Sequence, residues 1–476
     1  MVLGVSVTNV RALCLLSSLV ACAAPSEPGA TAPGLIRQLG TTIAAGDTVL
    51  LQPGRVGSPL PLDSILVRAA DTSALASAGR FMFEGRRPGR HRVEATVDGE
   101  LSVAFVDVVP SVSVGRWRQL DLGGSGGCGI TQDGRLACWG LTWKRSTGHI
   151  EISEGHTLAR PVFRAGLPAQ PRQVAVGSLG GCILVEGGSV YCWGDGFLGA
   201  PGIESDVPVR LHAVAVPPAT TLVAGGSHSC SLTAAGTAWC WGWNSSGQVG
   251  PVVVPRTIEG PQPIALPHAV RQLALGTLHS CALLQDGSVW CWGAAMDRVV
   301  EASGVPPLGQ PRRVDLPGPA TAIGSGSGHS CARLEDEALW CWGRGDYFSM
   351  ALTGAVLGPT RIATNVAPGD WGLAAAVTCV RTPPAELTCW GDNLASSLEF
   401  STYPGPFRMM LPANIGPLQH SRQSGLCAID AAGIASCWGG GSFGDGTGRS
   451  SRITRDGVPF IRRIAAPVEE SSLLRP

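Results

Sequence analysis

The residues with the clearest chemical potential are cysteines that occur in pairs ten positions apart. Seven such pairs account for 14 of the 16 cysteines, and Trp-Gly follows the second cysteine of every pair. Paired cysteines can bind a metal ion, act as a redox couple or form a structural disulfide. The pairs are Cys128 and Cys138, Cys182 and Cys192, Cys230 and Cys240, Cys281 and Cys291, Cys331 and Cys341, Cys379 and Cys389, and Cys427 and Cys437.

The spacing favours structural disulfides over the other two kinds of chemistry. A metal site normally combines two or more such pairs or adds histidines at ligand spacing, and a thioredoxin-like redox pair has only two residues between its cysteines. In the fourth repeat, a three-residue loop with Gly287 in the left-handed conformation places Cys281 opposite Cys291 in a β-hairpin. Directly opposed side chains have Cβ atoms about 4.5–5.5 Å apart, close to disulfide geometry. We therefore expect seven disulfides, each within one repeat.

The cysteine pairs also mark a repeat of the whole chain. Successive second cysteines are 48 to 54 residues apart, a period that fits a propeller blade or a kelch-type unit. In the fourth repeat, residues 271–276, 280–284 and 288–293 are short apolar runs broken by Gly or Asp-Gly, and residues 311–314 add a fourth run. Four short strands per repeat predict one blade of a β-propeller.

Two repeats depart from the turn pattern, and the closure of the ring is open. Glu337 replaces the turn glycine of the fifth repeat, and Pro383-Pro384 lies within the sixth. We therefore expect both turns to differ from the others. In the sixth repeat the reason is that proline is disfavoured at the second central position of a type I turn. Residues 460–466 look like the opening strand of another repeat, and residues 118–123 compete with them for closing the ring.

The full pattern of each repeat resembles a known family. Gly-x-x-His-Ser-Cys-x-Leu-x-x-x-Gly-x-x-Trp-Cys-Trp-Gly, at residues 225–242 and 276–293, resembles the regulator of chromosome condensation repeat, whose members form seven-bladed β-propellers. The paired-cysteine version is similar to secreted bacterial members, including a protein inhibitor of β-lactamase. The resemblance covers residues 117–467 and implies a seven-bladed β-propeller. The founding member is a nuclear guanine-nucleotide exchange factor, but no residue of its exchange surface can be carried over here.

The N-terminal residues predict export. A basic residue precedes the apolar run at 12–21, which has the length of a signal-peptide core and is too short to span a bilayer. Residues 19–22, Leu-Val-Ala-Cys, match the bacterial lipobox, so we expect residues 1–22 to be a signal peptide with lipid attached to Cys22. The alternative is cleavage near Ala24, which gives a soluble secreted protein. Either location is extracytoplasmic and oxidising, as paired cysteines require.

The remaining segments flank the propeller. Residues 23–33 are rich in Ala and Pro and predict a flexible linker. Residues 34–110 contain alternating apolar patches between Gly-containing turns, which predicts a small β-sandwich. Residues 88–99 resemble the late strands of bacterial immunoglobulin-like domains, and residues 468–476 form a tail. The predicted fold class is all-β, with a seven-bladed β-propeller preceded by a small immunoglobulin-like β-sandwich that lifts it from the membrane.

Composition and motifs give no indication of catalysis. Lysine plus arginine and aspartate plus glutamate both number 35, so the net charge offers no case for nucleic acid. His228, His279 and His329 recur at one repeat position, which favours a framework role because a catalytic residue is normally needed once. No phosphate-binding loop or catalytic triad stands out, so we expect no cofactor. The insertion at 141–170 contains acids and histidines, but we expect no metal there because such exposed polar loops are common.

The loops after each Trp-Gly should cluster on one rim of the ring and carry the function. Exposed aromatic residues beside charged residues are typical of protein-binding surfaces. We expect a monomeric, non-enzymatic protein that binds another protein, or a cell-wall component, through this rim. The expected contact residues are Trp143, Lys144, Trp243, Asn244, Asp297, Arg344, Asp346, Tyr347, Phe348, Asp392, Asn393, Phe443 and Asp445.

Three other functions remain open from the sequence. An extracytoplasmic enzyme or glycan-binding protein would have its site in the central channel, by analogy with other propellers. An inhibitor of β-lactamases or cell-wall enzymes follows from the family resemblance. Guanine-nucleotide exchange is a distant alternative, because an exported protein does not meet a cytosolic GTPase.

Overall fold

The computed structural model contains strands and no helix in the part of the chain that it describes. The described residues are 41–44, 48–50, 65–69, 75–79, 82–85, 89–97, 100–109, 115–124, 126–140, 161–178, 180–194, 211–251, 258–294, 309–344, 356–382, 386–391, 407–411, 415–421, 425–439 and 462–467. The predicted signal peptide, lipidation at Cys22, the linker and the tail therefore lie outside the described residues.

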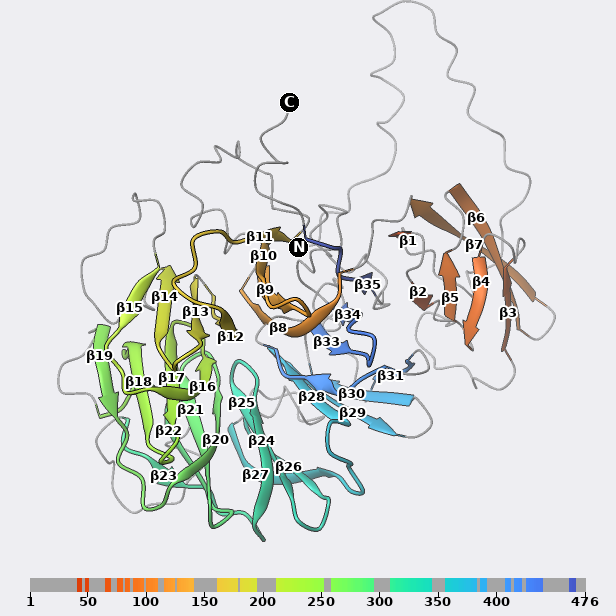
Figure 1. The fold of residues 1–476 in the computed structure, drawn as a ribbon. Coiled ribbons are helices and arrows are strands. Elements are labelled where there is room, and N and C mark those ends of the chain that lie inside the picture. Colours follow the sequence, from red (N-terminus) through yellow and green to blue (C-terminus); the bar gives the residue numbers. More distant parts are fainter. Residues whose placement is uncertain are drawn as a thin grey trace, which may run out of the picture.

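Among the described residues, seven strands precede the repeats and form two sheets (Figure 1). One sheet has the order β1-β7-β6-β3, with β1 and β7 parallel, and the other has the order β2-β5-β4. The predicted immunoglobulin-like arrangement of these sheets stays a prediction. The strands are β1 (Thr41–Ala44), β2 (Thr48–Leu50), β3 (Ile65–Ala69), β4 (Leu75–Gly79), β5 (Met82–Gly85), β6 (Gly89–Val97) and β7 (Glu100–Val109).

Seven four-stranded antiparallel sheets follow, one for each repeat, and they are the blades of a β-propeller (Figure 1). The first strands of neighbouring blades contact one another, so they line the central axis. These inner strands are β8 (Trp117–Gly123), β12 (Pro171–Val176), β16 (Ala219–Ala224), β20 (Val270–Leu275), β24 (Ala320–Ser325), β28 (Trp371–Ala374) and β32 (Leu418–Gln419). The second strands are β9 (Gly126–Thr131), β13 (Gly180–Val185), β17 (His228–Thr233), β21 (His279–Leu284), β25 (His329–Leu334), β29 (Val377–Thr382) and β33 (Gly425–Ile429).

The third strand of each blade carries Cys-Trp-Gly, and the fourth is the outer edge. The third strands are β10 (Leu136–Gly140), β14 (Val190–Gly194), β18 (Ala238–Trp243), β22 (Val289–Gly293), β26 (Leu339–Arg344), β30 (Glu386–Gly391) and β34 (Ala435–Gly439). The fourth strands are β11 (Val162–Phe163), β15 (His212–Val214), β19 (Ile258–Pro263), β23 (Arg312–Arg313), β27 (Val356–Ala363), β31 (Phe407–Met410) and β35 (Arg462–Arg463).

The cysteine pairs are disulfides in all seven blades. In blade four, Cys281 lies directly opposite Cys291, and His279 lies opposite Gly293 in the same register. The Cα atoms of the bonded cysteines are 4.0–4.1 Å apart in every blade. Gly287 has a φ of 79°, the left-handed conformation that the turn requires. The local spacing of the cysteines therefore predicted both the register and the pairing.

The turn of blade five corrects one expectation. Glu337 has a φ of 64° and occupies the left-handed position that glycine takes in the turns of blades one to four and seven. Its N–H donates to Leu334 O at 3.1 Å, just as Gly287 N donates to Leu284 O in blade four. Arg333 donates to the Glu337 carboxylate at 3.1 Å. The turn keeps its geometry because a side-chain contact holds a residue that would otherwise disfavour this conformation. In blade six, residues 383–385 lie outside the described residues.

The core consists of clusters that join neighbouring blades. The tryptophan after the second cysteine packs against the preceding blade: Trp342 contacts the cluster of blade four, and Trp241 contacts that of blade two. Trp139 of blade one packs with Cys427 and Cys437 of blade seven. These tryptophans are fully buried. Because burial of an aromatic side chain is a large stabilising contribution, the repeated tryptophan holds the ring together.

Blade one and blade seven close the ring through backbone hydrogen bonds. Trp117 N donates to Gly433 O at 2.7 Å, and Gly115 N donates to Ile464 O at 3.0 Å. Residues 462–463 are the outer strand β35 of blade seven, not the opening strand of a further repeat as their pattern suggested. Each blade is thus built from one continuous stretch of chain.

The antiparallel order gives the ring two different faces. The loops between third and fourth strands lie at the end where the inner strands finish, and we call this the loop face. The hairpin turns between second and third strands lie at the opposite end, where the inner strands begin, and we call this the turn face. The predicted rim belongs to the loop face.

Candidate functional site

The recurring histidines link neighbouring blades near the loop face. His228 Nε2 lies 2.9 Å from Ser280 Oγ of the next blade, and His279 Nε2 lies 2.8 Å from Ser330 Oγ. In the same way, His329 Nε2 lies 2.8 Å from Thr378 Oγ1 of blade six. Each histidine and each hydroxyl group is buried. The motif therefore has the framework role that its recurrence indicated.

The same geometry explains the glycine three residues before each histidine. A Cβ on Gly276 would lie 2.1 Å from His279 Cε1, and one on Gly225 would lie 2.2 Å from His228 Cε1. Only a residue without a side chain leaves room for the imidazole. Burial lowers the pKa of His279 to about 4, and burial together with neighbouring histidines lowers that of His329 to about 3. Both histidines are consequently neutral at physiological pH.

A second set of polar contacts joins the inner strands nearer the turn face. Gln119 Nε2 donates to Val174 O at 2.9 Å, and its Oε1 accepts from Val174 N at 3.0 Å. Gln272 makes the same two contacts with Ile323, at 2.8 and 3.0 Å. An inner strand has unpaired backbone groups at the edge that faces the axis, and these side chains satisfy them. These contacts were not recognised from the sequence, although Arg-Gln recurs at the start of three inner strands.

The loop face carries the two exposed large hydrophobic side chains of the described residues. Trp243 ends β18 and is 38% exposed, and its Nε1 donates to Ser245. Leu278 lies in the neighbouring blade, just before β21, and is 40% exposed. Trp243 N donates to Ser227 O, and Gly226 N of the same loop donates to Gly276 O beside the Leu278 loop. Trp243 was predicted from the sequence as a contact residue, whereas Leu278 was missed.

Asn244 corrects the predicted rim. It is only 1% exposed, its Oδ1 accepts from Val249 N at 2.9 Å, and its Nδ2 donates to Gly250 O at 3.3 Å. The side chain shapes the loop and cannot reach a partner. The backbone carbonyl oxygen of Gln248 in this loop accepts hydrogen bonds from Ser280 Oγ and Trp292 Nε1 of blade four. The loop is therefore anchored on the neighbouring blade.

The other predicted contact residues cannot be placed as side chains. Arg344 ends β26, and its side chain is not described. The remainder lie outside the described residues: Trp143, Lys144, Asp297, Asp346, Tyr347, Phe348, Asp392, Asn393, Phe443 and Asp445.

The described residues contain no group of three or more His, Cys, Asp or Glu side chains that could hold a metal ion. The same part of the chain has no helix long and apolar enough to cross a membrane.

Comparison with known proteins identifies the repeat. The family model of the regulator of chromosome condensation (RCC1) repeat matches residues 172–200, 219–248, 270–294 and 320–349. The ultraviolet-B receptor UVR8 of Arabidopsis thaliana is 24% identical over 189 residues, which are 37% of this chain and 41% of the receptor. The regulator of chromosome condensation of Drosophila melanogaster is 35% identical over 114 residues, or 23% of this chain and 21% of that protein. The chain thus spans less than half the length of these curated relatives.

A solved structure has the same fold. Prp20p from Saccharomyces cerevisiae superposes with a TM-score of 0.54 at 20% identity, and the match covers 74% of this chain and 87% of Prp20p. The four matched segments lie within blades two to five of the seven-bladed ring. The glycine, histidine and tryptophan positions that recur in the sequence also recur at equivalent places in blades three to five. The chain therefore carries regulator of chromosome condensation repeats in blades two to five, within a seven-bladed β-propeller.

Proposed function

We propose that this chain is a non-enzymatic propeller that binds another protein through its loop face. The observation that carries the proposal is the exposure of Trp243 and Leu278 on neighbouring blades of that face. Exposed tryptophan is strongly enriched among the residues that dominate protein–protein binding. The loop that follows Trp243 is held by buried hydrogen bonds, so the indole is presented from a fixed base and its ordering costs little on binding.

The relatives support a protein as the partner class. Prp20p is described by its binding properties to Gsp1p and histones, and a second solved structure is of Kap60 bound to yeast RCC1. All of these partners are proteins. The chain shares the fold of those propellers, and its own partner need not be related to theirs because function resides in the site and not in the fold.

We further propose an extracytoplasmic location. Seven disulfides persist in an oxidising compartment and are rare in reducing cytosol. Together with the lipobox, they support a chain that is anchored by lipid on Cys22 or secreted, with residues 34–110 as a spacer domain. Mass spectrometry of the N-terminal peptide tests the anchor. A diacylglyceryl group on Cys22 supports it, and an unmodified start at Ala23 or later contradicts it.

Site-specific photocrosslinking tests the binding face. A photoreactive amino acid replaces Trp243 or Leu278 on the loop face, or Glu186, which is exposed in a turn on the opposite face. Each variant is incubated with envelope proteins of the source organism, and the adducts are identified by mass spectrometry. We expect one protein to crosslink from the two loop-face positions and not from position 186.

The captured protein is then purified and titrated against Trp243→Ala. We expect binding to weaken by roughly 30-fold or more, because truncating a central aromatic contact costs about 2 kcal/mol or more. Adducts that form equally from both faces, or a Trp243→Ala variant that binds as the original chain does, would overturn the proposal.

A further inference from the structure

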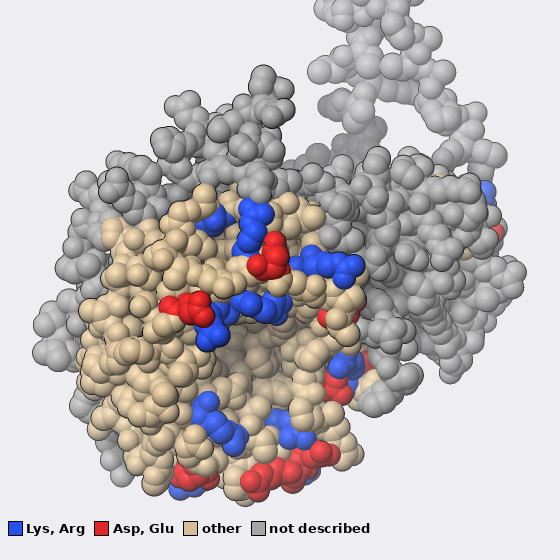
Figure 2. All heavy atoms as spheres, in the orientation of Figure 1, with Lys and Arg blue, Asp and Glu red and all other residues tan. Residues whose placement is uncertain are grey.

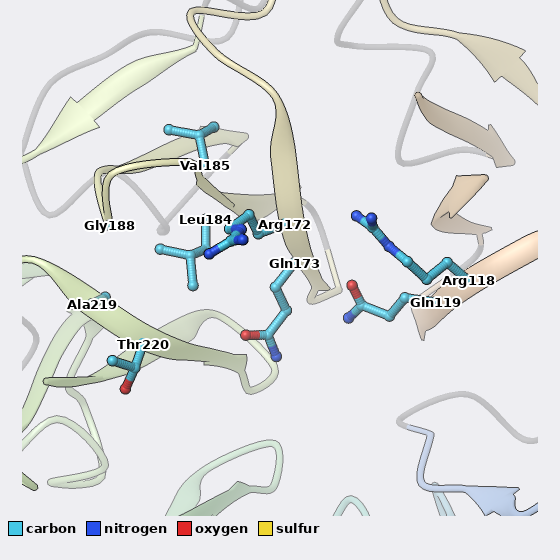
Figure 3. A pocket seen from close by; sticks show the side chains of 9 residues that line it. All are labelled: Arg118, Gln119, Arg172, Gln173, Leu184, Val185, Gly188, Ala219 and Thr220. Atoms are coloured by element: carbon cyan, nitrogen blue, oxygen red, sulfur yellow. The ribbon is translucent and has the colours of Figure 1, made fainter. Parts of the chain in front are cut away.

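The mouth of the central channel on the turn face contains a cavity of about 570 Å³. Its walls come from the starts of the inner strands of blades one to three and from the hairpin of blade two. Figure 3 shows Arg118 and Gln119 projecting from β8, and Arg172 and Gln173 projecting from β12. The lining contains these two arginines and no carboxylate. It is therefore a positively charged cavity in a chain with balanced overall charge.

The fold uses these arginines to different extents. Arg118 donates one hydrogen bond, to Pro171 O at 3.0 Å, and Arg271 at the same position of blade four donates to Ala320 O and Thr321 O. Arg172 is exposed and makes no hydrogen bond or ion pair with the described residues. Its guanidinium group has five N–H donors. Its charge is not required for holding the next blade in place.

Two carboxylates on or beside the inner strands have partners elsewhere in the fold. Asp121 Oδ2 accepts a hydrogen bond from Val176 N at 2.8 Å. Asp370 is paired with Arg381, whose Nε lies 2.6 Å from its Oδ1. The exposed acids of the adjacent turns form no ion pair with Arg172 among the described residues. Figure 2 shows basic side chains bordering the hollow at the centre of the ring, with acidic side chains beside some of them.

We propose that this cavity is a binding site for a small ligand with oxyanion groups, either carboxylate or phosphate. Guanidinium groups bind both kinds of oxyanion through paired, charge-assisted hydrogen bonds. The volume lies within the range of small-molecule sites, which is roughly 300–1,000 Å³. Gln173 offers a further donor, because its Oε1 accepts from Leu222 N at 2.9 Å while its Nε2 has no protein acceptor among the described residues. The site lies on the face opposite the proposed protein-binding surface and does not depend on it.

Isothermal titration of the full, disulfide-intact chain tests the site. The probes are citrate and inorganic pyrophosphate, each titrated separately at low ionic strength, because salt screens exposed charges. Tighter binding of citrate identifies a carboxylate ligand, and tighter binding of pyrophosphate identifies a phosphate ligand. Failure of both probes to saturate at millimolar concentration would overturn the proposal.

A matched pair of variants separates the cavity from general charge. Arg172→Gln removes the proposed contact, and Arg313→Gln removes an exposed arginine of the outer strand β23 whose side chain likewise makes no hydrogen bond or ion pair with the described residues. We expect Arg172→Gln to weaken anion binding by about 10-fold or more, and Arg313→Gln to leave it within about twofold. The thermal midpoints of both variants should match that of the unaltered chain, since neither arginine side chain makes a hydrogen bond or ion pair with the described residues. Equal weakening by the two variants would mean that only net charge is sensed, and the proposal would fail.

Discussion

The buried histidine ladder makes the propeller sensitive to acid, and His279→Asn tests this directly. His279 is almost fully buried, and its Nε2 is held by Ser330 Oγ at 2.8 Å. Burial lowers its pKa from 6.5 to about 4 because a charged imidazole loses hydration that the core cannot replace. The unfolded chain has a pKa near the ordinary value, so it binds more protons than the folded chain between these two values.

The sign and size of the effect follow from proton linkage. Stability is fully present above the unfolded pKa of 6.5 and falls as pH decreases towards the folded pKa near 4. For one histidine with this shift, the free energy of unfolding decreases by about 2 kcal/mol between about pH 8 and pH 5. His329, with a pKa lowered to about 3, adds a loss of similar size.

The assay is urea unfolding followed by tryptophan fluorescence at about pH 8 and pH 5, with disulfides intact. All 14 tryptophans lie at or after position 117, so the signal reports the propeller alone. Asparagine cannot titrate and retains a hydrogen-bonding group. The variant will be less stable than the original chain at pH 8, but its loss between pH 8 and pH 5 should be smaller by about 2 kcal/mol.

His268→Gln is the control, because it removes an imidazole that is 58% exposed and whose pair with Asp286, at 3.6 Å, is exposed and contributes little to stability. Its pH dependence should match that of the unaltered chain within a few tenths of a kcal/mol, as expected for surface changes. If His279→Asn loses as much stability on acidification as the unaltered chain, the histidine ladder does not carry the acid sensitivity and the reasoning is refuted.

Three further predictions concern stability and use the same unfolding assay. Glu337→Gly should be neutral or stabilising, whereas Gly287→Glu should lower the free energy of unfolding by about 1–2 kcal/mol. Both positions need the left-handed backbone, but only Glu337 has a side-chain contact, with Arg333, that holds it there. Equal effects of the two changes would contradict this. Replacing both Cys281 and Cys291 by serine should lower the unfolding free energy by about 2–3 kcal/mol at neutral pH, and dithiothreitol should then affect the variant less than the unaltered chain. Gln272→Leu should cost about 1–3 kcal/mol, because it leaves a backbone N–H and C=O of the next inner strand unpaired, and a change of less than a few tenths of a kcal/mol would show that water replaces the side chain.

The features that could be predicted from the sequence depend on local contacts. The ten-residue spacing, with its turn glycine, placed Cys281 opposite Cys291 because a short hairpin fixes its own register. The seven repeats also predicted seven blades, because each blade is formed by one continuous stretch of chain. Recurrence also showed that His279 belongs to the framework, although it could not show which residue the imidazole contacts.

The errors arose where the position of a neighbouring element decides the outcome. Asn244 looked like an exposed loop residue, but the loop folds against blade four and buries it. Residues 460–466 have the pattern of an inner strand, but Arg462–Arg463 form the outer strand β35, because blade seven still needs its fourth strand at that point of the chain. Leu278 went unnoticed, since an isolated apolar residue gives no signal until its exposure is known.

The sequence by itself determined the strands, the hairpin register, the disulfides and the number of blades, because these depend on residues that are close along the chain. Only the tertiary structure decided which residues meet across blades. His228 contacts Ser280, 52 positions away, and Arg118 and Arg172 line one cavity from separate strands. The physical reason is that closing the ring sets the distance between neighbouring inner strands, and no local pattern encodes that distance.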